Sequence, residues 1–220
     1  MYKACIFDLD GTLTDTLESL TYSVNATLQE LGLGQITPDQ CKAFVGHGAR
    51  RLIEDSLKAA GDPLASKIEE GMEAYGRIFK KNCTYNVKPY DGIVEMLAEL
   101  KTMGIKLAVL SNKPHLQTQD VVQTFFEEGT FLTVQGQRED VPRKPDPTGV
   151  HMILEELGVN SDECLYIGDS DVDMRTGTFA GVDTIGVPWG FRSKEVLQEN
   201  GATYIIDKPE KIISIIKGVE

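Results

Sequence analysis

Acidic side chains gather at two points of this chain, each directly after a short apolar run. Asp8 and Asp10 follow the first such run, and Asp169 and Asp173 follow a later one. Two like charges about 4 Å apart repel by about 4 kcal/mol at an effective dielectric near 20, so carboxylates brought together in this way need a cation among them. Mg²⁺ suits an all-oxygen set that leaves coordination positions open, because it keeps several waters and accepts phosphate oxygens. We therefore expect these four aspartates to form a Mg²⁺ site.

The remaining polar residues beside the apolar runs fit phosphoryl transfer. A carboxylate such as Asp8 can attack phosphorus and form an aspartyl phosphate, which splits one difficult displacement into two easier ones. The transition state spreads negative charge over three oxygens, and Ser111, Asn112 and Lys144 offer the hydroxyl, amide and ammonium that would stabilise it. Asp10 lies two residues beyond Asp8, so in extended backbone it points to the same side and can act as general acid and then base.

The apolar runs themselves predict the fold class. They are short, rich in β-branched and aromatic residues and apolar on both faces, which is typical of a parallel sheet covered by helices on each side. The expected strands are residues 4–7, 105–110, 131–134, 164–167, 184–187 and 204–206. Helical patterns separate most of them, including one from Ile93 to Met103 with Asp91 as its expected cap. We expect a doubly wound α/β sheet, with ligands at the carboxyl ends of its strands, where the polar residues fall.

The interval between the first two expected strands has helical periodicity and no convincing strand. A stripe of apolar residues and a capping box formed by Thr37 and Gln40 predict its first two helices. The stripe comprises Leu17, Leu20, Val24, Leu28 and Leu31, and further helices are expected over 49–60 and 64–81. The simplest account divides the chain into an α/β core, residues 1–16 and 86–220, and an inserted helical cap, residues 17–85. The alternative is that these helices pack on the sheet.

Composition and charge limit the partners. Hydrophobic residues make up 41% and charged residues 25%, as in an ordinary globular protein, and the formal net charge is −12. Such a charge repels nucleic acids and anionic membranes, so an anionic substrate needs a local site of opposite charge. The four cysteines form no CxxC pair and are expected to be reduced. With no room for a signal peptide and no apolar run of about 20 residues, we expect a cytoplasmic monomer or homodimer acting on a small phosphorylated metabolite.

Four motifs in order along the chain resemble those of the haloacid dehalogenase superfamily. They are FDLDGTLTDT from Phe7, LSNKP from Leu110, RKPDP around Lys144 and GDSDVDM from Gly168. The resemblance implies that Asp8 is the nucleophile and a metal ligand, and that Asp10 is the general acid and base and binds the metal through its backbone carbonyl. It implies that Asp169 binds the metal directly or through water and that Asp173 supports the metal site. Ser111 and Lys144 would bind the phosphoryl group.

The same resemblance implies that the helical insertion is a cap that closes over the active site and selects the leaving group. Within the superfamily, VGHGARRLI from Val45 and VPWGFRS from Val187 are most similar to the phosphoglycolate phosphatases. Arg50 on the cap would then receive the carboxylate of glycolate. A phosphomutase similar to β-phosphoglucomutase and an inorganic pyrophosphatase of the same superfamily are the alternatives, and a phospho-receiver signalling domain is the non-enzyme alternative.

Overall fold

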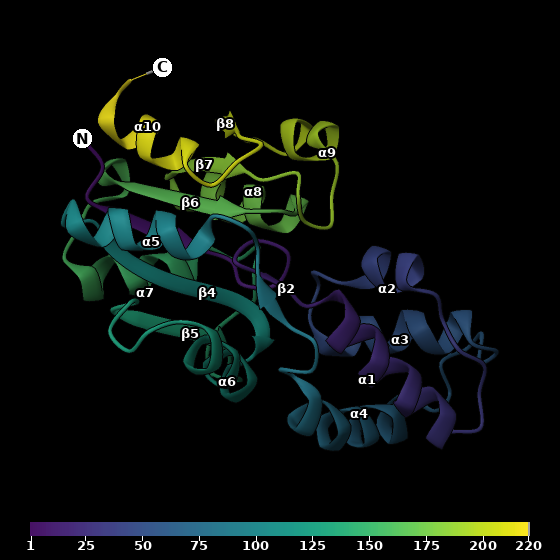
Figure 1. Cartoon of the computed structure of the whole chain (residues 1–220). Helices are drawn as coiled ribbons and strands as arrows, with labels where there is room; N and C mark the ends of the chain where they lie inside the picture. The colour runs from purple at the N-terminus through teal and green to yellow at the C-terminus, as the bar shows by residue number, and fades with distance from the viewer. Residues whose placement is uncertain (220) are drawn as a thin grey trace.

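The computed structural model describes residues 1–219, and six of its strands form one sheet in the order β5-β4-β1-β6-β7-β8 (Figure 1). Every neighbouring pair in this sheet is parallel. The strands are β1 (Ala4–Phe7), β4 (Lys106–Pro114), β5 (Thr133–Gln137), β6 (Cys164–Gly168), β7 (Asp183–Gly186) and β8 (Tyr204–Ile205). All six match the strands expected from the sequence, so the α/β class is confirmed, with strand ends that shift by up to a few residues.

Side chains alternate between the two faces of the sheet, and each face has its own apolar core. Cys5 and Phe7 of β1 belong to a core shared with α5, α6 and α10, whereas Ala4 and Ile6 belong to one shared with α7 and α8. These helices are α5 (Ile93–Thr102), α6 (His115–Phe125), α7 (Thr148–Leu157), α8 (Asp171–Ala180) and α10 (Lys211–Lys217), and α9 (Lys194–Glu199) follows β7. The sheet is therefore covered on both faces, as a strand apolar on both sides requires.

The remaining helices lie together beside the sheet and not on its faces (Figure 1). They are α1 (Leu17–Glu30), α2 (Pro38–Phe44), α3 (Ala49–Ala59) and α4 (Ile68–Asn82). Their apolar stripes bury one another in a third core, to which the sheet-bearing part of the chain contributes Phe191. The capping box at the start of α2 is present, since Thr37 and Gln40 each bind the other's backbone N–H. The division of the chain into domains at these boundaries stays a prediction.

Two local details differ from the sequence-based expectations. The interval expected to lack strands begins and ends with two-residue strands, β2 (Thr14–Asp15) and β3 (Lys88–Pro89), which pair antiparallel where the chain leaves and re-enters the core. The residue before α5 is Gly92 in the left-handed conformation, with no side-chain cap, so the expectation for Asp91 is wrong. Each helix within residues 1–219 is too short or too polar to cross a membrane.

Candidate active site

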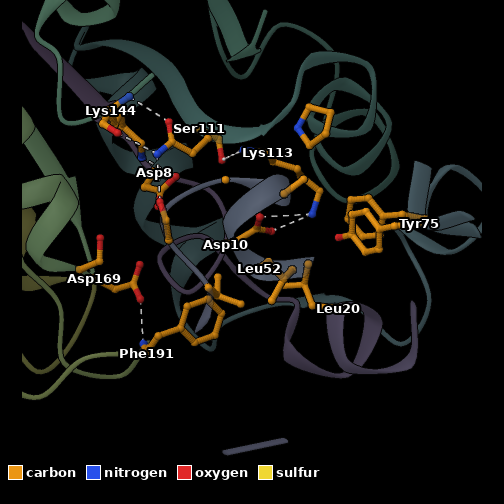
Figure 2. Close-up of a pocket in the computed structure, with 18 residues that line it drawn as sticks. Asp8, Asp10, Leu20, Leu52, Tyr75, Ser111, Lys113, Lys144, Asp169 and Phe191 are labelled. Carbon is orange, nitrogen blue, oxygen red and sulfur yellow. Dashed lines mark hydrogen bonds and ion pairs between the residues drawn. The ribbon is translucent and has the colours of Figure 1, made fainter. Parts of the chain in front are cut away.

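Asp8 lies at the carboxyl end of β1, near the middle of the sheet. The register pairs Phe7 with Val109 of β4 and with Ile167 of β6, and the Asp8 N–H continues the ladder by donating to the Ile167 carbonyl oxygen at 2.9 Å. The residues that follow these positions on the neighbouring strands, Ser111 and Asp169, therefore reach the same edge of the sheet. Figure 2 shows Asp8, Ser111 and Asp169 around one pocket.

Three of the four expected aspartates form one cluster at this edge of the sheet. Asp8, Asp169 and Asp173 each place a carboxylate oxygen within 4.8 Å of the others, and all three are buried. Burial, followed by the negative charge of Asp173, raises the pKa of Asp8 to about 7. Burial, followed by the charges of Asp173 and Asp8, also holds the pKa of Asp169 well above its usual range. Without a cation, the site therefore resists carrying all three negative charges.

Lys144 supplies one positive charge to this cluster. Its Nζ lies 2.8 Å from Asp173 Oδ1, 2.9 Å from Asp8 Oδ1 and 3.1 Å from the Leu110 carbonyl oxygen. Burial opposes the charge on Lys144, but Asp173 and Asp8 together outweigh it and hold the lysine pKa well above its ordinary value. Asp173 is fixed in turn by Ser170, the N-cap of α8, whose hydroxyl and N–H both donate to Asp173 Oδ2. Ser170 at the start of α8 thus orients the Asp173 carboxylate, which in turn positions Lys144.

Asp169 is packed against the backbone of two glycines, Gly11 and Gly190, at which there is no room for a Cβ atom. Thr12 Oγ1 donates to its Oδ1 at 3.1 Å, and the Phe191 N–H donates to its Oδ2 at 2.7 Å. A Cβ on Gly190 would lie 2.4 Å from Asp169 Cβ and 2.3 Å from the Gly11 carbonyl oxygen. Gly11 has φ +85°, and a Cβ there would meet the Asp169 carboxylate at 2.4 Å. The two glycines allow the backbone to enclose this carboxylate and fix its direction.

The donor set fits a divalent metal ion. Apart from the Lys144 ammonium, whose Nζ lies 2.9 Å away, Asp8 Oδ1 is buried without a hydrogen-bond partner. One ammonium offsets only part of the charge of three buried carboxylates, so the site is costly unless a further cation completes it. Oxygen ligands alone favour a hard cation of the Mg²⁺ or Ca²⁺ kind. Asp173 has less to offer such an ion than Asp8 or Asp169, since it does not line the pocket and its two oxygens accept from Lys144 and Ser170.

Asp10 turns its carboxylate away from the other three. Lys113 Nζ lies 2.9 Å from its Oδ1 and 3.3 Å from its Oδ2, so this aspartate is held by a buried ion pair on the cap side of the pocket (Figure 2). The expectation that all four carboxylates surround one ion is therefore not met by the side chain of Asp10. The position does leave Asp10 facing the space between Asp8 and the cap, where a leaving group would lie.

Ser111 and Asn112 both line the pocket, but their roles differ. The Ser111 hydroxyl accepts a hydrogen bond from the Lys113 N–H at 3.3 Å and keeps its own proton available to donate. Both amide protons of Asn112 are used, because its Nδ2 donates to the Lys144 and Gly46 carbonyl oxygens at 3.1 and 2.9 Å. Its Oδ1 accepts from the Lys144 N–H. Asn112 therefore positions Lys144 and the cap, and has no amide proton left for a phosphoryl group.

The structure does not bring Arg50 into the pocket. Its guanidinium pairs with Glu69 at 2.6 Å, both side chains are largely exposed, and Arg50 is absent from the residues that line the cavity. The cap wall is made instead by apolar and aromatic side chains, none of which was predicted from the sequence to line the site: Leu20, Val45, Leu52, Tyr75 and Phe79. Tyr75 and Phe79 lie one turn apart on α4, and this spacing is the signal that places them on one face.

Comparison with known proteins agrees with this geometry. Residues 5–187 match the family model of the haloacid dehalogenase-like hydrolases. The phosphoglycolate phosphatase of Aquifex aeolicus is 32% identical over 214 residues, which cover 97% of this chain and 96% of that protein. A solved structure from Lactobacillus delbrueckii subsp. bulgaricus has a TM-score of 0.89 at 32% identity and covers 98% of both chains. A predicted phosphoglycolate phosphatase from Haemophilus somnus has a TM-score of 0.90 at 25% identity, over 97% of both chains.

A parallel sheet that carries a buried aspartate, a paired lysine and two further carboxylates at one edge defines a hydrolase of the phosphoryl-transfer type. The match over most of the chain makes the family assignment definite. This protein belongs to the haloacid dehalogenase-like hydrolases.

Proposed function

We propose that the protein is a Mg²⁺-dependent phosphatase that hydrolyses a small phosphorylated metabolite through an aspartyl phosphate on Asp8. One observation carries this proposal. Asp8 is buried at the end of β1 in a group of three carboxylates, and Lys144 is the only partner of its Oδ1 within residues 1–219. Three carboxylates buried together beside a single ammonium oppose folding, which supports a role in binding a cation and a phosphoryl group.

The residues around Asp8 divide the work of the reaction. Asp8 attacks phosphorus, while Lys144 and the Ser111 hydroxyl hold the phosphoryl oxygens and stabilise the charge that spreads over them. Asp8 and Asp169 would hold the metal ion, with Asp173 in support and the Asp10 backbone carbonyl as a further ligand. When bound, Mg²⁺ supplies positive charge to the phosphoryl oxygens and allows the three carboxylates to ionise together.

Asp10 handles the protons. Its carboxylate lies on the cap side of Asp8, so it protonates the leaving oxygen in the first step and removes a proton from water in the second. The aromatic and aliphatic cap wall excludes bulk water while the aspartyl phosphate forms.

Phosphoglycolate is our candidate substrate. The relative from Aquifex aeolicus, which matches this chain almost end to end, is named phosphoglycolate phosphatase, and further relatives at about 30% identity have the same name. The pocket is lined on the leaving-group side by closely packed cap residues, which suits a small alcohol.

We also propose a cytoplasmic location, supported by four free, buried cysteines, since thiols persist where the compartment is reducing.

The test begins with metal-depleted protein and p-nitrophenyl phosphate. We expect hydrolysis only after Mg²⁺ is added, and none from Asp8→Asn, which keeps the side-chain shape but removes the nucleophile. Asp162→Asn, an exposed aspartate that precedes β6 and so lies at the end of the sheet opposite to Asp8, is the matched control and should keep full activity. Turnover without metal, or activity in Asp8→Asn, would contradict the mechanism. Phosphoglycolate, pyrophosphate and a hexose phosphate are then compared, and isomerisation of the hexose phosphate would identify a mutase.

A further inference from the structure

The positive charge that lines the pocket comes from two lysines among the described residues, and only one of them, Lys113, lies beside Asp10 on the cap side. Lys144 already has three oxygen atoms within about 3 Å of its ammonium, two of them carboxylate oxygens. The other, Lys113, is the last lysine of β4 and has only Asp10 as an oxygen partner for its ammonium within residues 1–219. Arg50, the cation expected from the sequence, pairs with Glu69 outside the cavity.

Lys113 is held in surroundings that make its charge effective. Its side chain is 1% exposed, and its Nζ lies 4.7 Å from the centroid of the Phe79 ring. Phe79 stacks on Tyr75 at 5.0 Å, so the ammonium lies between the Asp10 carboxylate and the aromatic face of α4 (Figure 2). An ammonium has three N–H donors, and an aromatic face is a weak substitute for an oxygen acceptor. In such a low-dielectric site an anion is attracted far more strongly than at the surface.

The position of Lys113 relative to Asp10 then defines what it can bind. Asp10 protonates the leaving oxygen in the proposed mechanism, and Lys113 Nζ is within 3.3 Å of both Asp10 carboxylate oxygens. A group attached to the carbon beside the leaving oxygen therefore lies next to Lys113. The other side chains on this wall, including Leu20, Leu52 and Phe79, offer that group no charge. A neutral alcohol gains nothing from the lysine, whereas a carboxylate on the adjacent carbon gains an ion pair.

We propose that Lys113 is the specificity-determining residue of the pocket, and that it binds the carboxylate of the leaving alcohol. The enzyme then selects short phosphate esters of 2-hydroxy acids over equally small neutral esters. This inference rests on the proposed phosphatase function, because it takes Asp10 as the residue beside the leaving oxygen. Lys113 on strand β4 thus takes the role in substrate selection that the sequence analysis gave to Arg50 on the cap.

The experiment compares phosphoglycolate with ethyl phosphate, which has the same two-carbon alcohol without the carboxylate. The measured quantity is the ratio of the two kcat/KM values, with Mg²⁺ present, for the wild type, Lys113→Met, Lys113→Gln and Arg50→Met. Using a ratio removes any loss of turnover that both substrates share through the contact between Lys113 and Asp10. We expect the ratio to fall by roughly 10- to 100-fold in both Lys113 variants, as the loss of a charged hydrogen bond predicts. The ratio in Arg50→Met should equal that of the wild type.

Three results would overturn the assignment. The first is a wild-type protein that hydrolyses p-nitrophenyl phosphate, with a loss of activity in Asp8→Asn, but does not prefer phosphoglycolate to ethyl phosphate. The substrate comparison in this case is made on the wild type, so it does not depend on whether the Lys113 variants fold. The second is an unchanged ratio in the Lys113 variants, and the third is a ratio that falls in Arg50→Met. In each of these cases the phosphatase function stands. If no phosphate ester is hydrolysed with Mg²⁺, the proposed function and the role of Lys113 fall together.

Discussion

Without the metal, the stability of this protein should fall as the pH rises between the two pKa values of Asp8, 3.8 in the unfolded chain and about 7 in the fold. The raised pKa of Asp8, about 7 against an ordinary value of 3.8, means that between these two values the folded protein holds a proton that the unfolded chain has lost. Stability decreases with pH wherever the folded state binds more protons. The difference is about three pKa units at 1.36 kcal/mol each, so the metal-free fold loses roughly 4 kcal/mol between pH 4 and pH 7.

The assay is urea unfolding of EDTA-treated protein between pH 4 and pH 8, with Asp8→Asn as the comparison. The amide of Asp8→Asn cannot ionise, so the wild type should lose roughly 4 kcal/mol more than the variant over this range, equivalent to about 10 °C in Tm for a chain of this size. Taking the difference between the two proteins cancels the many exposed carboxylates that titrate in both. Asp169 also titrates in both, and the loss of the Asp8 charge relieves it only in the variant, which adds to the difference.

Mg²⁺ should reverse the loss in the wild type. A cation at 100 times its dissociation constant stabilises the folded state by about 2.7 kcal/mol, and this gain should be large at pH 7.5 and small at pH 5, where Asp8 holds its proton. Parallel stability curves for the wild type and Asp8→Asn without metal would refute the reasoning, because they would mean that burial and the neighbouring carboxylates do not perturb Asp8. A Mg²⁺ effect that is equal at both pH values would refute the link between this ionisation and the metal site.

Three further predictions concern the residues that support the site. Gly190→Ala should lower the free energy of unfolding by about 1–3 kcal/mol, because the added methyl group would displace Asp169. The same variant should bind Mg²⁺ more weakly, as measured by calorimetry. The control is Gly76→Ala, exposed on α4 with open space around it, which should be neutral or slightly stabilising. Asn112→Ala should lower kcat and cost about 1–3 kcal/mol in urea unfolding, since it leaves buried backbone groups unpaired. Arg192→Ala removes the side chain that donates to three carbonyl oxygens at the end of α2, so we expect a higher KM and faster proteolysis of the cap than in Arg192→Lys. Equal values for the paired variants, or an Asn112→Ala protein with normal kcat, would contradict these roles.

The sequence predicted the sheet and its acidic edge because both depend on short-range patterns. A strand buried on two faces needs an unbroken apolar run, and a functional residue at its carboxyl end follows that run directly, as Asp8 follows Phe7 and Asp169 follows Gly168. The ion-pair partner of Asp10 lies on a distant chain segment and was not predicted. Asp10 and its partner Lys113 are 103 positions apart. No local pattern distinguishes a lysine that points into a pocket from one that points into solvent.

Asn112 and Arg50 show that a residue type suited to a role does not establish that the residue has that role. Residue type alone allowed an amide to bind phosphate and a cap arginine to bind carboxylate, but each side chain is satisfied by another partner: Asn112 by the backbone of Lys144 and Gly46, and Arg50 by Glu69. A hydrogen-bond donor that is already used cannot also bind a ligand without a cost of about 1–3 kcal/mol. Counting the donors that remain free is therefore a stronger guide to the binding residues than residue type, and it requires coordinates.

The same count connects the cap to Lys144, the lysine proposed to bind the phosphoryl group. Asn112 donates one amide proton to the carbonyl oxygen of Lys144 and the other to that of Gly46, the cap residue above the pocket. If the cap moves away, Asn112 loses one of its three partners and the loop that carries Lys144 loses part of the constraint on its position. Arg143, next to Lys144, also donates to the cap, at the His47 carbonyl oxygen. Closure of the cap and the alignment of Lys144 with Asp8 are thus favoured by the same contacts, so the site is best ordered when the pocket is shut.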